Sequence, residues 1–158
     1  MLKGALLLQA ADAAAADNEP EEAFALHGQA RAIADRREKD DIVSSVYFGP
    51  TEVGVREVRL LVRLGQLDKA LRLARGVSIP ADAPIGTQIR YLVTMAFAYT
   101  RTRDDVAAVF ALNRVAALAP ADLRFDPSAR QAIRGLTKRG HVLVAEDLAK
   151  LSSEACLA

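Results

Sequence analysis

The sequence has few of the residues from which metal sites, disulfide frameworks and aromatic cores are built. It contains no tryptophan, one cysteine and two histidines among 158 residues, and aromatic side chains make up only 5%. One cysteine cannot form an intramolecular disulfide, and structural zinc sites usually take four Cys or His ligands. The sequence therefore predicts no metal and no cofactor, and the lone Cys156 is typical of a reducing, cytoplasmic compartment.

Catalytic motifs and long apolar runs are also absent from the sequence. There is no Gly-rich phosphate loop, no His-Glu-x-x-His, no Cys-x-x-Cys and no Gly-x-Ser-x-Gly elbow. We therefore expect no catalytic residues and no enzymatic activity. No stretch approaches the ~18 uninterrupted apolar residues of a membrane span, and Gln9 interrupts the apolar start before a secretory signal is complete. These features predict a cytoplasmic protein without a membrane partner.

The chain also lacks an excess of charge of either sign. Lys and Arg number 21 and Asp and Glu number 20, which leaves a formal net charge of +1. A domain that binds nucleic acid directly usually carries a basic face and a recognisable motif. We therefore expect this chain to reach DNA only through a separate domain.

Small and medium aliphatic residues, chiefly alanine and leucine, make up most of the 51% hydrophobic content. Residues 2–16 contain neither proline nor a β-branched residue, so helix propensity is high there. Asp17 to Glu19 then interrupt the pattern, and Pro20 suits the first turn of a second helix. These two segments predict a helical hairpin. Because the first helix is poor in charge, we also expect a homodimer that forms through this end.

The segment from Lys39 to Pro50 differs from the rest, because it combines β-branched residues with glycine and proline. We interpret it as an ordered, partly extended loop without a sheet, anchored in the core by Phe48. The valines of residues 51–64 would permit a strand. The length of this run and the helical spacing of its apolar residues favour a helix instead.

Further helices are predicted over 67–76, 87–101, 102–119, 126–138 and 142–151, with a capping box at Thr102 and Asp105. Small residues recur at the expected helix crossings, at positions 23, 70 and 108. The distances in sequence between these three positions exceed the ~34 residues of a tetratricopeptide repeat, but they suit stacked helix pairs. We therefore expect an all-α fold with a single domain over residues 1–158. Its form would be a short right-handed tetratricopeptide-like superhelix of about three helical hairpins, with one or two C-terminal closing helices.

Residues 48–52, Phe-Gly-Pro-Thr-Glu, open a helix that runs to a Leu-Gly turn at 64–65. This segment resembles the C-terminal helical region of actinobacterial helix-turn-helix regulators of the xenobiotic-response-element type, in which Phe-Gly-Pro-Thr-Asn opens such a helix. Residues 3–11 and 119–127 are similar as well, so the resemblance spans nearly the whole chain. Glu52 replaces the usual Asn of the family, and Arg56 stands where His is frequent.

The resemblance implies a function in regulation. The family's N-terminal DNA-binding domain is absent here, so the chain is either a truncated piece or a stand-alone relative. We expect a non-catalytic regulatory or protein-interaction domain of a bacterial transcriptional regulator. The alternative is a free-standing tetratricopeptide-like adaptor scaffold unrelated to transcription.

A stripe of arginines is the strongest candidate for a binding site. Arg56, Arg59 and Arg63 follow the i, i+3, i+7 spacing that places them on one side of a helix. By analogy with tetratricopeptide stacks, a concave groove would be lined by Glu52, Arg56, Arg59, Arg63, Arg90, Phe97 and Arg101. Guanidinium groups suit carboxylates and phosphates, so the groove would take a peptide, a protein or a small anionic effector. The alternative is that the stripe is an ordinary solvated face.

The two histidines, His27 and His141, have no partner at a motif spacing. We expect both to be ordinary surface residues.

Overall fold

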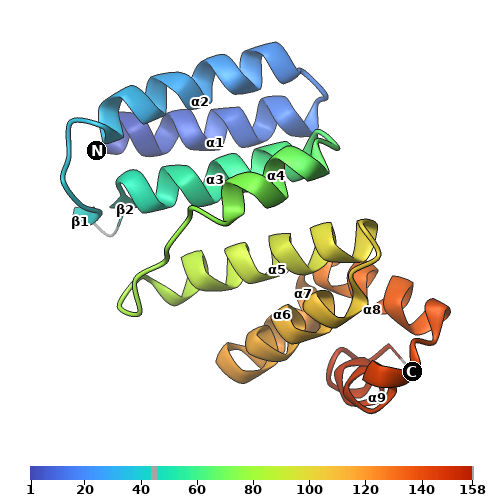
Figure 1. The fold of residues 1–158 in the computed structure, drawn as a ribbon. Helices are drawn as coiled ribbons and strands as arrows, with labels where there is room; N and C mark the ends of the chain where they lie inside the picture. Colours follow the sequence, from blue (N-terminus) through green and yellow to red (C-terminus); the bar gives the residue numbers. More distant parts are fainter. Residues whose placement is uncertain (44–45, 158) are drawn as a thin grey trace. The chain divides into compact units, whose positions relative to one another are not determined.

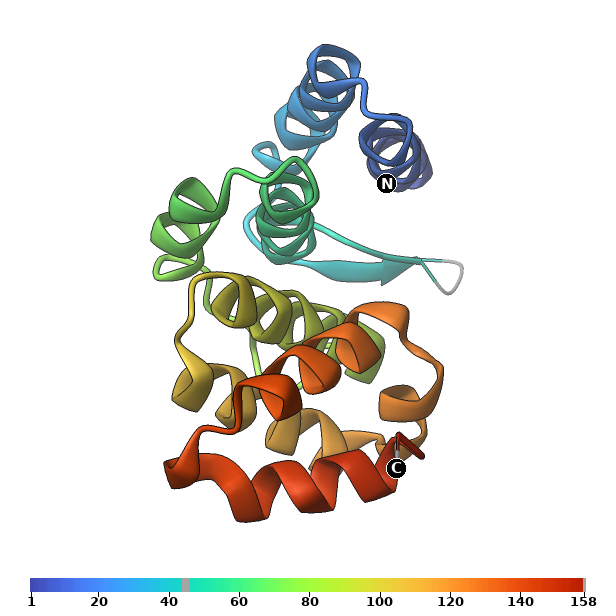
Figure 2. The same ribbon diagram turned by 90° about the vertical axis from the view of Figure 1, so that its right-hand side faces the viewer.

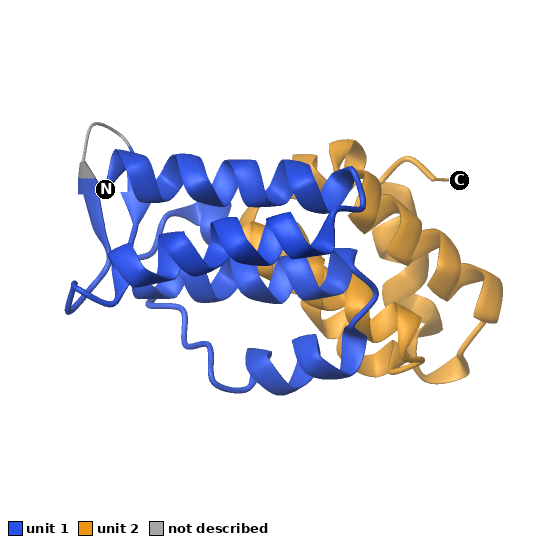
Figure 3. Cartoon of the chain, turned by 90° about the horizontal axis from the view of Figure 1, so that it is seen from above, with its two compact units in different colours: residues 1–87 blue, residues 88–158 orange. Residues whose placement is uncertain are grey.

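The computed structural model describes residues 1–43 and 46–157 of the chain. These residues are mostly helical and include one small two-stranded sheet, which confirms the all-α prediction (Figure 1). The chain divides into two compact units, Met1–Thr87 and Gln88–Ala158 (Figure 3). The single domain over 1–158 stays a prediction.

Unit 1 begins with the expected helical hairpin, α1 (Leu2–Ala16) and α2 (Pro20–Ala34). The two helices run antiparallel and lie side by side (Figures 1 and 2). Ala23 and Ala30 on α2 are fully buried, and their small side chains let the helices approach closely. The turn places Asn18 at a positive φ of 60°, a conformation that asparagine tolerates better than most residues.

A second hairpin follows, formed by α3 (Pro50–Arg63) and α4 (Leu67–Ala74). The helix predicted over 51–64 is thus confirmed despite its valines. Gly65 closes α3 with a φ of 71°, where a Cβ would be strained, and the N–H of Gln66 donates to the carbonyl of Leu61 at 2.8 Å. Helix α3 packs against both α1 and α2.

The segment before α3 forms a β-hairpin, so the expectation of no sheet was wrong. Strands β1 (Asp41–Val43) and β2 (Val46–Phe48) pair antiparallel, with Asp41 opposite Phe48 and Ile42 opposite Tyr47. β-branched and aromatic residues favour this extended pairing. Strand β2 packs against α1 and α3. The side chain of Phe48 is fully buried there, as predicted.

Unit 2 contains most of α5 (Ile85–Arg101), whose first three residues belong to unit 1. It continues with α6 (Asp105–Leu118), α7 (Pro120–Phe125), α8 (Pro127–Arg139), a 3₁₀ turn at Val142–Val144 and α9 (Ala145–Glu154). Its core is aliphatic, and the largest side chains that are fully buried there are Leu112, Leu123, Ile133, Leu136 and Leu151.

Helix starts in unit 2 agree only partly with the sequence predictions. Asp126 caps α8 as expected, accepting from the N–H groups of Ser128 and Ala129 at 2.8 and 2.9 Å. The capping box at Thr102 was wrong, because Asp104 caps α6 instead and the Thr102 hydroxyl donates to a carbonyl of the preceding helix. Short helix α7 was not predicted, because the proline at its first position was interpreted as a helix stop.

The contact between Gly4 of α1 and the ring of Phe48 provides a test of this fold. A Cβ at Gly4 would lie 2.6 Å from Cε2 of Phe48. We expect Gly4→Ala to lower the free energy of unfolding by about 1–3 kcal/mol, because the packed ring has little room to move. Phe48→Ala should cost about 3–5 kcal/mol. Urea denaturation followed by circular dichroism measures both.

Gly28→Ala is the matched control, since Gly28 lies on α2 with nothing near its added Cβ. It should raise stability by about 0.5–1 kcal/mol through helix propensity alone. In a Phe48→Leu background the cost of Gly4→Ala should shrink, because the clash partner is smaller. A Gly4→Ala variant as stable as Gly28→Ala would contradict the packing described.

Candidate functional site

Arg56 is buried in unit 1 between two carboxylates. Its Nε donates to Oε1 of Glu52, one helical turn earlier on α3, at 2.8 Å. Its Nη1 donates to the carboxylate of Asp12 on α1. The hydroxyl of Thr87 donates to the second oxygen of Glu52 at 2.9 Å. The guanidinium thus joins α1 to α3 through charge-assisted hydrogen bonds.

The other two arginines of the stripe also approach Asp12. Nη1 of Arg59 lies 3.7 Å from the carboxylate of Asp12, and Nη1 of Arg63 donates to its backbone carbonyl at 3.0 Å. All three guanidinium groups are therefore engaged with one residue of α1. This observation favours a structural role for Arg56, whose charge is matched on both sides.

Sequence reasoning missed Asp12, although a signal was present. Lys3 and Asp12 are the charged residues of α1, and the rest of that helix is almost entirely alanine and leucine. A carboxylate in such a helix needs either solvent or a cationic partner. Asp12 has a cationic partner, which is supplied by arginines more than forty positions later in the chain.

The remaining residues of the predicted groove belong to unit 2. On α5 the guanidinium of Arg101 lies 5.8 Å from the centroid of the Phe97 ring, within the range of a cation–π interaction. Arg90 lies on the same helix. The groove of Glu52, Arg56, Arg59, Arg63, Arg90, Phe97 and Arg101 and its anionic ligand stay a prediction.

His27 is buried, so its assignment as a surface residue was wrong. Its Nε2 donates to the carbonyl oxygen of Val53 at 3.0 Å and so joins α2 to α3. The signal was its spacing, because positions 23, 27, 30 and 34 share the buried face of α2. His141 is exposed, as expected.

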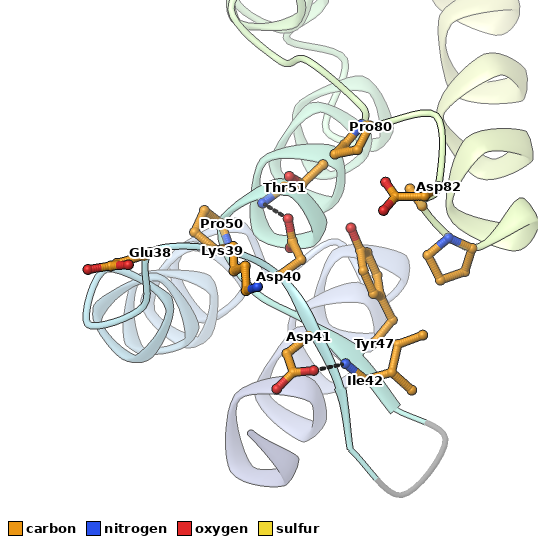
Figure 4. Close-up of a pocket in the computed structure, with 12 residues that line it drawn as sticks. Glu38, Lys39, Asp40, Asp41, Ile42, Tyr47, Pro50, Thr51, Pro80 and Asp82 are labelled. Atoms are coloured by element: carbon orange, nitrogen blue, oxygen red, sulfur yellow. Dashed lines mark hydrogen bonds between the residues drawn. The ribbon is translucent and has the colours of Figure 1, made fainter.

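An open cavity of about 500 Å³ lies at the amino-terminal end of α3 (Figure 4). Its walls come from the β-hairpin and the residues before it, from the first turn of α3, and from the segment that precedes α5. The lining residues are Glu38, Lys39, Asp40, Asp41, Ile42, Tyr47, Pro50, Thr51, Pro80, Asp82, Ala83 and Pro84. This volume lies within the range of small-molecule binding sites.

Asp40 fixes one wall of the cavity. Its Oδ2 and Oδ1 accept from the backbone N–H groups of Thr51 and Glu52, at 3.2 and 3.1 Å. A carboxylate suits this place because the first N–H groups of a helix are unpaired and partly positive. Gly49 permits the approach, since a Cβ there would lie 2.5 Å from the Cα of Asp40.

Tyr47 forms another part of the lining. Burial raises the pKa of its phenol to about 12, and the negative charge of Asp40 and a hydrogen bond with it act in the same direction. The phenol therefore stays protonated at neutral pH. It can donate a hydrogen bond but cannot act there as a base or a nucleophile.

Sequence reasoning missed this cavity, because its residues come from loops and a short hairpin and match no motif. Among the described residues, no group of three or more His, Cys, Asp or Glu side chains is placed to hold a metal ion. None of the helices that they form is long and apolar enough to cross a bilayer.

The chain was compared with protein-family models, with curated proteins and with solved structures, and none of the three comparisons gives a match.

The buried guanidinium provides a second test. We expect Arg56→Ala to lower the free energy of unfolding by about 3–5 kcal/mol, because Glu52 and Asp12 then keep their charges without the cation between them. Arg56→Lys should recover part of this loss, since an ammonium keeps the charge but not the planar fork. Chemical denaturation at neutral pH measures each value.

Arg75→Ala is the control, because Arg75 is exposed at the end of α4. This substitution should change the free energy of unfolding by no more than about 0.5 kcal/mol. Equal losses for Arg56→Ala and Arg75→Ala would show that the pairing contributes nothing to stability.

Proposed function

We propose that the chain is a non-catalytic regulatory or protein-interaction domain of a bacterial transcriptional regulator, and that it associates with a second copy through α1. The residues shared with actinobacterial helix-turn-helix regulators support the regulatory part. The two successive helical hairpins of unit 1 support a tetratricopeptide-like architecture. Its further partner would be a peptide, a protein or a small anionic effector, and DNA would be reached through a separate domain.

The outer face of α1 is the observation that carries this proposal. Leu2 and Leu6 lie one turn apart on it with 52% and 69% of their surfaces exposed. Asp12, one of the two charged residues of α1, is turned toward α3 by its bond with Arg56. Large apolar side chains grouped on the exposed face of a helix are a feature of protein–protein interfaces.

Self-association would explain how such a domain acts on transcription. Helix-turn-helix domains usually read two half-sites as a dimer, and a two-fold contact between copies supplies the matching symmetry. An effector that binds one form of the dimer more tightly would shift the populations of the two forms.

The test fuses the chain to a DNA-binding domain that occupies its operator only as a dimer. We expect the fusion to repress a reporter placed behind that operator, and the isolated chain to give a dimer mass by light scattering. Leu6→Glu should abolish both effects, because two buried carboxylates would meet at the contact. Operator occupancy and mass are measured on the same variants.

Phe125→Glu is the matched control, since Phe125 is 79% exposed in unit 2 and lies outside α1. It should leave repression and dimer mass unchanged. A monomer mass for the unaltered chain at high concentration, or equal loss in both variants, would refute association through α1.

A further inference from the structure

The cavity at the start of α3 is separate from the α1 face and has the features of a ligand site. Part of its lining is apolar, since Pro50, Pro80, Pro84 and the ring of Tyr47 all belong to it. Ile42 also belongs to the lining and leaves 58% of its surface exposed. An aliphatic chain of a few carbons laid against these residues would cover apolar surface that water now contacts.

The polar part of the lining is acidic. Glu38, Asp40, Asp41 and Asp82 contribute four carboxylates against the single ammonium of Lys39, a formal balance of −3. The chain as a whole carries +1, so this negative charge is local to the cavity. The charge selects a cation as the ligand.

The four carboxylates of the cavity differ in the hydrogen bonds that they form with the rest of the chain. Asp40 accepts two backbone hydrogen bonds at α3, and Asp41 accepts one from the N–H of Ile42 at 2.7 Å. Glu38 and Asp82 form no hydrogen bond or ion pair with any residue that the structure describes. In Figure 4, Asp82 lies on the segment across the cavity from Asp40, with the Tyr47 hydroxyl between them. A carboxylate is therefore left for a ligand on the far wall.

The same arrangement argues against an inorganic cation. A divalent ion needs several oxygen ligands that converge on one point at about 2.0–2.6 Å. No three of the described acidic side chains, those of the cavity included, are grouped closely enough to form such a set. Carboxylates dispersed among apolar lining residues suit instead an extended organic cation, whose charge is spread over several N–H donors.

We propose that this cavity binds an alkylguanidinium group, either in the arginine side chain of a polypeptide or in a small guanidine. The carboxylate of Asp82 pairs with the planar head, and Tyr47 offers an aromatic ring on which a guanidinium stacks. The prolines and Ile42 hold the aliphatic stem. A guanidinium fits better than an ammonium because it forms bidentate pairs with carboxylates and stacks on aromatic rings.

This site goes beyond the proposed function, because none of its residues lies on α1. The two proposals can therefore fail separately. The monomeric Leu6→Glu chain should bind the guanidinium ligand as the unaltered chain does.

The experiment titrates the whole chain with N-acetyl-argininamide at low salt, followed by calorimetry and by chemical shifts of Ile42 and Tyr47. We expect saturable binding with a Kd of order 1 mM or below, as for a single side chain. N-acetyl-citrullinamide has nearly the same shape without the charge and should not bind. Added salt should weaken the arginine complex, because the site is open to solvent.

Asp82→Asn should weaken binding about tenfold, because it removes one charge-assisted pair. Asp82 lies in an exposed loop without a described partner, so this variant should fold normally, and its melting curve checks that. Asp68→Asn, an exposed acid on α4, is the matched control and should bind as before. Tyr47→Phe should retain most of the affinity, since the ring stays in place.

Butylguanidinium distinguishes the two sources of the ligand. Equal affinity for butylguanidinium and N-acetyl-argininamide would show that the head and stem suffice, as for a free guanidine. Much tighter binding of N-acetyl-argininamide would indicate an arginine in a polypeptide, and either result supports the proposal. Absence of saturable binding, equal binding of N-acetyl-citrullinamide, or indifference to Asp82→Asn would each overturn it.

Discussion

The charge of Arg56 is the constraint around which unit 1 is arranged. A guanidinium cannot be neutralised by deprotonation, so once buried it needs acceptors that the fold must supply. Glu52 supplies one from the same helix, and Asp12 supplies the other from α1. The pairing specifies how α1 and α3 meet, which alanine contacts alone do not, because small apolar side chains fit one another in many positions. Thr87 extends the network by donating to Glu52.

The segment between α2 and α3 has a comparable effect at the amino-terminal end of α3. Phe48 inserts its ring against Gly4, and eight residues earlier Asp40 binds the first N–H groups of α3. The β-hairpin between these two residues is therefore held at both ends. This explains why strands of only three residues are ordered, although so short a hairpin is not stable alone. The cavity follows from this arrangement, because the held hairpin forms one of its walls.

What could be predicted from the sequence depends on how local the deciding interactions are. Helix α1 needs only its alanines and leucines, and α2, α3 and α8 begin at prolines, so these elements were predicted to within a residue or two at their starts. Thr102 and Asp104 compete for the same cap within three positions, and spacing alone selected the wrong one. The partners of Asp12 and His27 lie 44 and 26 residues away, beyond any spacing rule. The cavity is harder to predict, because its walls come from a β-hairpin, the first turn of a helix and a loop, which share no sequence spacing.

The charges on and around helix α3 suggest one site in the sequence and another in the structure. The sequence points to its arginines, and the structure points to the cavity at its amino-terminal end. Its arginines are conspicuous in the sequence because they are periodic, but periodicity also brings them together on α1, where Asp12 engages them. The acidic residues near its amino-terminal end do not follow a helical spacing. One of them, Asp40, accepts hydrogen bonds from the first N–H groups of the helix. Asp82 belongs to neither network. The arginines already contact Asp12, whereas the carboxylate of Asp82 is exposed beside apolar side chains of the cavity, so the cavity offers a ligand a charge that the fold does not use.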